Sequence, residues 1–343
     1  MGRTLRATLG LTLVAGLVLA ACGGGGTATP GGSTATRASG PRLGSFDRPI
    51  VLAFTPSVEA ATISTNGAAI KAALERATGL AWKVTAMTSY AAQVEGMCSG
   101  AIDIGFFAPL QMTLLLNKQC GTPVLAALRR PDQTKPESAT NALSPTYESQ
   151  IVVRVDSGIN DLNGLKGKKF AFVDTLSASG YVYPTLTIKN KVGQDPKTFF
   201  AANGIIFAGG HPQAALAVYN KQVDGAAMYI DARDLVVAAN PDIKNATKVI
   251  EKAGPIPNDG VALRKGLPDD LGKQVTSALT DYVKSDDGKK VVYTLYQWDG
   301  LQTVDAKFFD PMNEAAKLAG VDVEKLAQNT PRPAATPAPS KTP

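Results

Sequence analysis

Two serines near the middle of the chain, Ser177 and Ser179, follow an apolar segment and precede a run with helical character. Serine commonly caps a helix, because its hydroxyl reaches the first backbone N–H groups. The first helical turn also carries unsatisfied N–H groups and about half a positive charge. The two hydroxyls and the amides of Ala178 and Gly180 would therefore converge on one point and could bind an oxyanion. Such neutral donors need no buried counter-charge. Plain helix capping is the alternative.

The single histidine, His211, lies between Gly209-Gly210 and Pro212. These neighbours predict a loop tip at the start of a helix, and such loops often carry function. An imidazole donates a hydrogen bond to an oxyanion in either protonation state. The alternative is a structural residue at the helix start. One histidine cannot build a His-rich metal site, and we expect neither metal nor cofactor.

Asp231 follows a predicted strand, and its role is open. A carboxylate beside an anion repels it, unless the ligand carries an amine or a protonated oxygen that donates to the carboxylate. Asp231 could equally cap the helix that follows.

The elements that would position these residues alternate between strand and helix. This alternation predicts an α/β protein in which each of two lobes has a central mixed sheet flanked by helices. The expected strands cover residues 49–54, 81–85, 102–107, 151–154, 169–173, 226–230 and 260–264. The expected helices cover residues 68–77, 90–98, 110–117, 179–191 and 213–220.

Two segments, 99–108 and 221–230, repeat one plan of helix end, polar turn, Asp and buried strand. Ligands of open α/β sheets bind beyond the carboxyl ends of strands, which points to Phe107 and Tyr229. The Asp residues at the strand starts are expected to be structural. The chain would cross between lobes near residues 147–149 and 254–255, making a hinge and a closing cleft.

The segment 147–174 resembles the substrate-binding proteins of ABC importers for phosphate, phosphite and phosphonate, the PhnD-like family. Further motifs similar to that family follow in order: the Ser-Gly turn 177–180, Gly-Gly-His at 209–211, and 223–226. Residues 54–57 and 103–109 match its pattern ahead of them. The resemblance implies a two-lobed type II periplasmic-binding-protein fold with the ligand cleft between the lobes.

The resemblance also implies roles for single residues. The turn at 177–180 would hold the phosphorus oxygens, His211 would donate from lobe 2, and Ser57, Phe107 and Tyr147 would face the ligand. Ala178 stands where the family commonly has a hydroxyl residue. The expected ligand-binding residues are Ser57, Phe107, Tyr147, Ser177, Ala178, Ser179, Gly180, His211, Tyr229 and Asp231.

The chain begins with the layout of a signal peptide, residues 1–21, with two arginines and then an apolar run. Leu-Ala-Ala-Cys at 19–22 resembles a lipobox, in which Cys22 is lipidated and anchors the protein to the membrane. A signal with a chance cysteine is the alternative. Residues 22–47 read as a flexible Gly/Thr/Ser linker, and 329–343 as a disordered Pro-rich tail.

The body divides into lobe 1, residues 48–148 plus 255–328, and lobe 2, residues 149–254. With Cys22 assigned to the lipobox, Cys98 and Cys120 are expected to form a disulfide in an oxidising compartment. The protein would be exported, anchored by lipid on the extracytoplasmic face, and monomeric.

The formal charge of +6 is mild, and no Lys/Arg cluster is interleaved with aromatics, so nucleic-acid binding is not expected. The expected function is capture of a small phosphorus oxyanion for a membrane permease of an ABC importer. A binder of another solute, such as a sulfonate, a thiamine precursor or an amino acid, would need a fixed Arg or other charge pattern in the cleft. A secreted phosphate-ester enzyme is disfavoured, because no GxSxG motif and no metal-ligand cluster occur.

Overall fold

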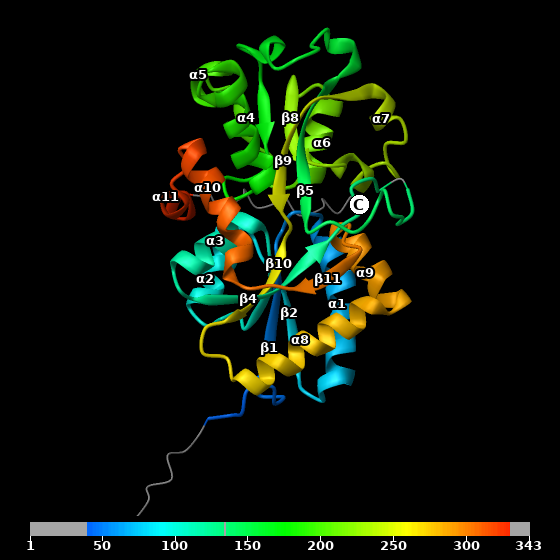
Figure 1. Cartoon of the computed structure of the whole chain (residues 1–343), viewed down its shortest axis with the longest axis vertical. Helices are drawn as coiled ribbons and strands as arrows, with labels where there is room; N and C mark the ends of the chain where they lie inside the picture. Colours follow the sequence, from blue (N-terminus) through cyan, green and yellow to red (C-terminus); the bar gives the residue numbers. More distant parts are fainter. Residues whose placement is uncertain (1–39, 134, 330–343) are drawn as a thin grey trace, which may run out of the picture. The chain divides into compact units, whose positions relative to one another are not determined.

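The computed structural model describes residues 40–133 and 135–329, and Figure 1 shows their arrangement. The predicted signal peptide, Cys22, most of the linker and nearly all of the tail lie outside these residues. The end of the predicted linker is packed against the folded body: the Gly44 carbonyl accepts from the Ala81 N–H at 2.8 Å. The Cβ of Leu80 lies 3.2 Å from where a Gly44 Cβ would stand, so Gly44 is packed closely against Leu80.

The first sheet has six strands and defines lobe 1. Their spatial order is β11 (Gly300–Thr303), β4 (Gly121–Leu128), β10 (Gly260–Arg264), β3 (Ile104–Phe107), β1 (Ile50–Phe54) and β2 (Trp82–Ala86). The strands β3, β1 and β2 are parallel, whereas β10 and β11 run antiparallel to β4. The helices of this lobe are α1 (Ala60–Thr78), α2 (Tyr90–Cys98), α3 (Pro109–Asn117), α8 (Asp269–Lys284) and α9 (Asp286–Tyr296).

The second sheet has five strands and defines lobe 2. Their spatial order is β7 (Ile205–Phe207), β6 (Phe170–Phe172), β8 (Gly225–Tyr229), β5 (Thr146–Arg154) and β9 (Thr247–Pro257). The strands β7, β6 and β8 are parallel, and β5 is antiparallel to both of its neighbours. The helices are α4 (Tyr183–Val192), α5 (Pro196–Phe199), α6 (His211–Tyr219) and α7 (Ile243–Ala246).

The mixed sheets expected from the sequence are confirmed, but two long strands were missed. Strand β4 contains Pro123, which cannot donate to a ladder and weakens a strand pattern. The structure accommodates this proline where the register with β10 shifts between Val261 and Ala262. Strand β9 carries Gly254-Pro255 and several charged residues at the edge of its sheet. Helix α1 begins at Ala60, about two turns before the expected start at residue 68.

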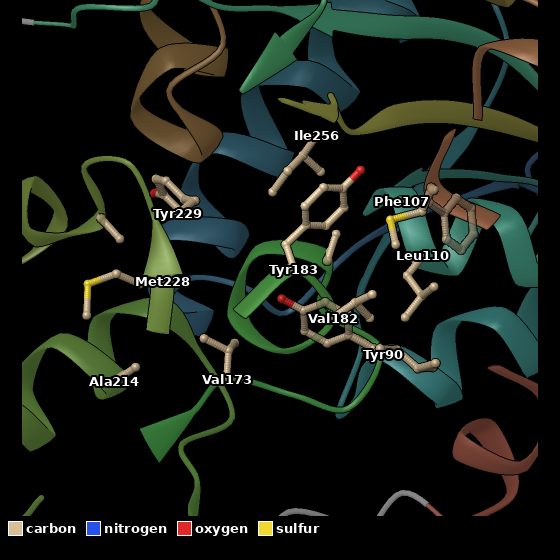
Figure 2. Close-up of a cluster of buried hydrophobic side chains, with 14 of the residues drawn as sticks. Tyr90, Phe107, Leu110, Val173, Val182, Tyr183, Ala214, Met228, Tyr229 and Ile256 are labelled. Atoms are coloured by element: carbon tan, nitrogen blue, oxygen red, sulfur yellow. The ribbon is translucent and has the colours of Figure 1, made fainter. Parts of the chain in front are cut away.

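The chain passes between the sheets after β4 and again between β9 and β10. A further link is made by α10 (Asp310–Ala319), which contacts α3 of lobe 1 and α4 of lobe 2. The chain then continues into α11 (Val323–Asn329). A buried cluster runs between the lobes: Figure 2 shows Tyr90, Phe107 and Leu110 of lobe 1 opposite Val173, Met228 and Tyr229 of lobe 2. The lobes therefore share part of their apolar core.

Cys98, the last residue of α2, is joined to Cys120, which immediately precedes β4. Their Cα atoms lie 4.8 Å apart, and the bridge closes a loop with a sequence separation of 22. The bridge fixes the ends of α2 and α3 at the edge of lobe 1. Among the described helices, none is long and apolar enough to cross a membrane.

Candidate functional site

A small cavity lies where the two lobes meet. Both sheets contribute the ends of their strands to its wall, as expected for an open α/β sheet. It is lined by Thr55, Ser57, Tyr90, Phe106, Phe107, Ala108, Arg129, Tyr147, Ser177, Ser179, His211, Tyr229, Asp259, Tyr296 and Trp298. Seven of the residues expected to bind ligand are therefore brought together: Ser57, Phe107, Tyr147, Ser177, Ser179, His211 and Tyr229.

The serine turn enters its helix through a π-helical turn, Ala178–Val182, and the α-helix proper begins at Tyr183. The helix was expected to start at Ser179, but a wider π-helical turn precedes it in the structure. The Ser177 Oγ accepts from the Gly180 N–H at 3.0 Å. A Cβ on Gly180 would lie 2.5 Å from Val173, so only glycine fits there. Ser177 both caps the turn and lines the cavity, and its hydroxyl hydrogen is still able to donate.

Ser179 is held by residues of β5. Its Oγ accepts from the Tyr147 hydroxyl at 3.3 Å, and its carbonyl accepts from the Ser149 hydroxyl at 2.6 Å. Burial raises the pKa of Tyr147, which therefore stays a neutral donor. These contacts attach the serine turn to the strand that enters lobe 2 and fix the direction of the Ser179 hydroxyl.

His211 is the first residue of α6 and is buried. Its backbone N–H donates to the Ser57 carbonyl of lobe 1 at 3.1 Å. Its Nδ1 accepts from the Tyr229 N–H at 3.2 Å, so in the neutral ring the hydrogen is on Nε2. Burial, together with the nearby charge of Arg129, lowers the pKa of His211 to about 3. His211 is thus a neutral donor whose one N–H is available to a ligand.

The lobe 1 wall is held by the loops after β1 and β3. The Tyr296 hydroxyl donates to the Thr55 carbonyl at 2.7 Å, and the Gln93 amide donates to the Phe106 carbonyl at 2.8 Å. Ser57 lies two residues after Thr55, Phe107 follows Phe106 directly, and both line the cavity. Phe107 contributes an apolar surface and no hydrogen bond.

An ion pair between Arg129 and Asp259 forms the charged part of the wall, which was not expected from the sequence. The Arg129 Nη2 lies 2.8 Å from the Asp259 Oδ2, which also accepts from the Trp298 Nε1 at 3.2 Å. The guanidinium carbon lies 4.9 Å from the centre of the Tyr147 ring and 5.2 Å from that of Tyr229. Arg129 is 4% exposed, so this charge is taken almost completely out of water.

Arg129 corrects two expectations. The cavity does hold a fixed charge, whereas only neutral donors were expected. A fixed Arg therefore no longer separates a binder of phosphorus oxyanions from a binder of another solute. Asp259 neutralises Arg129, so the pair adds no net charge. Arg129 follows β4, a strand that was not predicted, and lies 130 residues from its partner. The sequence did contain a signal that could have indicated these two residues. Arg129-Arg130 and Asn258-Asp259 are charged or polar pairs at the ends of apolar runs.

Three of the expected ligand-binding residues do not line the cavity. Ala178 and Gly180 are buried within the π-helical turn. Ala178 would reach a ligand only through its backbone, and the Gly180 N–H is already taken by the Ser177 Oγ. The Asp231 carboxylate accepts from the Arg233 N–H at 3.3 Å and pairs with the Arg233 side chain at 2.9 Å. Burial works against ionisation, but the Arg233 hydrogen bond lowers the pKa of Asp231. Asp231 thus caps the short helix that begins at Ala232, which was the alternative role considered for it.

Comparison with known proteins begins with a family model described as the periplasmic substrate-binding protein of a phosphonate ABC transporter, which matches residues 52–309. The phosphate-import protein PhnD of Mycolicibacterium smegmatis is 31% identical over 205 residues, 58% of this chain and 60% of that protein. The phosphonates-binding periplasmic protein of Escherichia coli is 29% identical over 213 residues, 60% of this chain and 58% of that protein. The matched region thus spans about 60% of each relative.

Among solved structures, a binding protein component of an ABC phosphonate transporter from Pseudomonas aeruginosa is similar, with a TM-score of 0.68 and 22% identity. The match covers 81% of this chain and 94% of that one. This likeness shows the fold, and the two-lobed type II periplasmic-binding-protein fold expected from the sequence is confirmed.

Proposed function

This chain belongs to the family of periplasmic substrate-binding proteins of phosphonate ABC transporters, and from that premise we propose that it captures a small phosphorus oxyanion for such an importer. The relatives named above are described as binding or importing phosphate in one case and phosphonates in the other. The proposed ligand is accordingly phosphate, phosphite or a small phosphonate.

The observation that carries the proposal is the convergence of donors from both lobes on one small buried cavity. Ser177, Ser179 and His211 contribute from lobe 2, and Arg129 from lobe 1. The serine turn adds the positive end of a helix. A tetrahedral oxyanion accepts hydrogen bonds from every side, so it can use donors arranged in this way.

Binding would favour the closed arrangement of the lobes. The backbone N–H of His211 donates to the Ser57 carbonyl of the other lobe, and Gln213 donates to Glu59 at 2.6 Å. A ligand held by donors of both lobes binds the closed form better than the open form, which shifts the population towards it. A permease of the same importer would then recognise the closed form. We propose that the protein acts as a monomer and has no enzymatic activity.

The proposed location is the extracytoplasmic face of the cell membrane, where lipidated Cys22 would anchor the protein. The family is periplasmic, which supports export. Cys22 lies outside the described residues, and its modification rests on the sequence pattern. Mass spectrometry of the protein purified from membranes tests it: diacylglyceryl on an N-terminal Cys22 is expected, and an unmodified or differently cleaved N-terminus contradicts it.

The function is tested by calorimetric titration of a protein that begins at residue 41 with phosphate, phosphite, methylphosphonate and 2-aminoethylphosphonate. Micromolar or tighter binding of at least one is expected, with one ligand per chain. Methanesulfonate and a thiamine precursor serve as the rival solutes, and tight binding of either with none of the phosphorus compounds contradicts the proposal. A phosphate-release assay on phosphate esters should show no turnover.

A further inference from the structure

Two side chains of the cavity hold polar groups that nothing in the described part of the chain satisfies. Arg129 uses Nη2 for Asp259, while its Nε and Nη1 have no hydrogen-bond partner. The hydroxyl of Tyr229 is also without a partner, and only 5% of that residue is exposed. A buried donor left unpaired is costly, so such groups are expected to meet a ligand. These donors point to an ionised oxygen in the cavity.

Asp259 lines the same cavity, but its carboxylate needs a hydrogen-bond donor on the ligand. One of its oxygens, Oδ2, already accepts from Arg129 and Trp298. The carboxylate is still 18% exposed and lines the cavity, so it has acceptor capacity left. A ligand oxygen next to this carboxylate must carry a hydrogen, because two acceptors in contact repel each other.

The charge balance leads to the same requirement. Arg129 and Asp259 cancel, and His211 and the surrounding tyrosines are neutral, so no further side-chain charge of the cavity offsets the ligand. One negative charge can be stabilised by the unpaired N–H donors of Arg129 and by the helix end, but a second would be buried beside Asp259 without compensation.

We infer that Arg129 and Asp259 together select the singly protonated monoanion of a phosphorus oxyacid. Arg129 and Tyr229 donate to an ionised oxygen, while Asp259 accepts from the P–OH group. This inference rests on the proposed function and adds the ionisation state of the ligand. Sulfate, which has no proton at neutral pH, and the dianions of phosphate and phosphonates are rejected.

The groups around Asp259 leave a usable pH window. Burial raises the pKa of its four tyrosine neighbours, Tyr90, Tyr147, Tyr229 and Tyr296. His211 remains neutral, and Arg129 remains charged. Asp174, near Tyr90, has a pKa raised to about 6 by burial, and Asp231, near Tyr229, has a lowered pKa. Burial also raises the pKa of Asp259 itself, against the lowering effect of Arg129. Measurements between pH 7 and pH 9 therefore follow the ligand together with Asp259.

The test is calorimetry of the wild-type chain with phosphate, phosphite, methylphosphonate and sulfate in that window, in two buffers of different ionisation enthalpy. Above the second pKa of a bound phosphorus ligand, its apparent Kd should rise about tenfold per pH unit with uptake of one proton. Sulfate should not bind. A pH-independent Kd without proton uptake overturns the inference, whereas failure of every phosphorus ligand to bind at any pH contradicts the proposed function instead.

Sulfate binding accompanied by proton uptake also overturns the inference, because it would place the proton on Asp259 rather than on the ligand. The same conclusion follows if 2-aminoethylphosphonate binds far more tightly than methylphosphonate and Asp259→Asn removes that preference. Asp259 would then recognise an amine.

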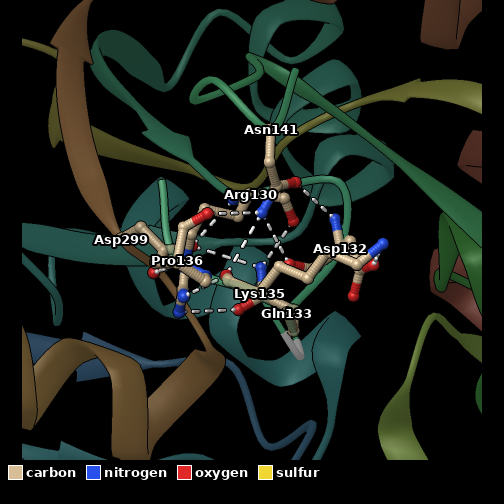
Figure 3. A network of polar contacts seen from close by, with 7 residues as sticks. All are labelled: Arg130, Asp132, Gln133, Lys135, Pro136, Asn141 and Asp299. Atoms are coloured by element: carbon tan, nitrogen blue, oxygen red, sulfur yellow. Dashed lines mark hydrogen bonds and ion pairs between the residues drawn. The ribbon is translucent and has the colours of Figure 1, made fainter. Parts of the chain in front are cut away.

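The decisive variant is Asp259→Asn, which can donate to a fully ionised oxygen. We expect a Kd almost independent of pH and measurable binding of sulfate. The matched control is Asp299→Asn, because Asp299 pairs at 2.9 Å with the neighbouring Arg130 outside the cavity (Figure 3). This control should keep the wild-type pH slope and reject sulfate. An Asp259→Asn protein that keeps both properties overturns the inference. If that variant does not fold, the wild-type measurements decide.

Discussion

The Ser177 hydroxyl combines the two roles that were opposed in the sequence analysis. It accepts from the Gly180 N–H, which shapes the turn, and it lines the cavity between the lobes. A hydroxyl can accept and donate at once, so capping and ligand binding do not compete for it. Ser179 has no capping contact, since its Oγ accepts from Tyr147. The two serines therefore differ in what their removal costs.

Replacing each serine by alanine separates these roles. Ser179→Ala should weaken binding of the best phosphorus ligand about tenfold, the loss of one hydrogen bond, and should lower stability by leaving the buried Tyr147 hydroxyl without its acceptor rather than by removing a cap. Ser177→Ala should weaken binding to a similar extent and also lower the free energy of unfolding by about 1 kcal/mol. Calorimetry and urea unfolding measure the two effects.

Ser285→Ala is the matched control for capping. Ser285 caps α9 by accepting from the Gly288 N–H at 3.0 Å, the same distance as for Ser177, and it does not line the cavity. It should lose stability and keep its affinity. If Ser177→Ala and Ser179→Ala both bind like the wild type, the ligand does not lie at the serine turn.

How much of the site could be predicted depends on how local its signals are. Ser177, Ser179 and His211 stand at helix starts, and a start is marked by neighbours within a few residues. Arg129 and Asp259 gain their meaning only from each other, across 130 residues and two different strand ends. Sequence alone could not show that these two loops meet, so the charged part of the wall was missed.

At the scale of elements, the loop between β6 and the π-helical turn depends on Asp174. Its carboxylate accepts from the Leu176 N–H at 2.8 Å, and its carbonyl accepts from the Ser177 N–H at 2.9 Å. Burial raises the pKa of Asp174 from 3.8 to about 6. The folded protein thus binds this proton more tightly than the unfolded chain. Its contribution to stability is present below pH 4 and is lost as the pH rises to about 6.

Asp174→Asn should remove this loss of stability at higher pH. The amide oxygen keeps the acceptor for Leu176, but no charge is buried at neutral pH. At pH 7.5 the ligand-free variant should be more stable than the wild type, by about 1.4 kcal/mol for each unit of the pKa shift. At pH 4 the difference should nearly vanish. Urea unfolding at both values measures this.

Asp161→Asn is the comparison for Asp174→Asn. Asp161 also accepts from a backbone N–H, that of Gly164 at 3.0 Å, but it is exposed. Since Asp161 is not buried, Asp161→Asn should not reproduce the gain in stability at pH 7.5. An Asp174→Asn variant whose advantage grows on acidification would contradict the assignment of a raised pKa.

The missed strands show where element prediction from sequence stops. Strand β4 carries Pro123 and β9 carries Pro255, and a proline within a strand pattern argues against a strand. Both are accommodated by pairing with partners far away in the chain. β4 lies between β10 and β11, and β9 pairs with β5. Only these non-local ladders stabilise the two segments as strands.

At the scale of the whole binding unit, the polar contacts between the lobes differ from the contacts to the ligand. Gln213 of α6 donates to the Glu59 carboxylate at the start of α1, at an exposed position. Neither residue lines the cavity. This contact connects the two lobes, so it contributes to affinity only through the stability of the closed form.

Gln213→Ala should therefore increase the dissociation rate of the ligand about fivefold, the loss of roughly 1 kcal/mol from one hydrogen bond that the open form lacks. The association rate should change little. Stopped-flow displacement gives the rate, and small-angle scattering with and without ligand reports the compaction. The matched control is Gln222→Ala, an exposed glutamine in the turn after α6 of the same lobe. If both variants release ligand at the same rate, or if the wild type does not become more compact on binding, closure of the lobes is not coupled to ligand capture.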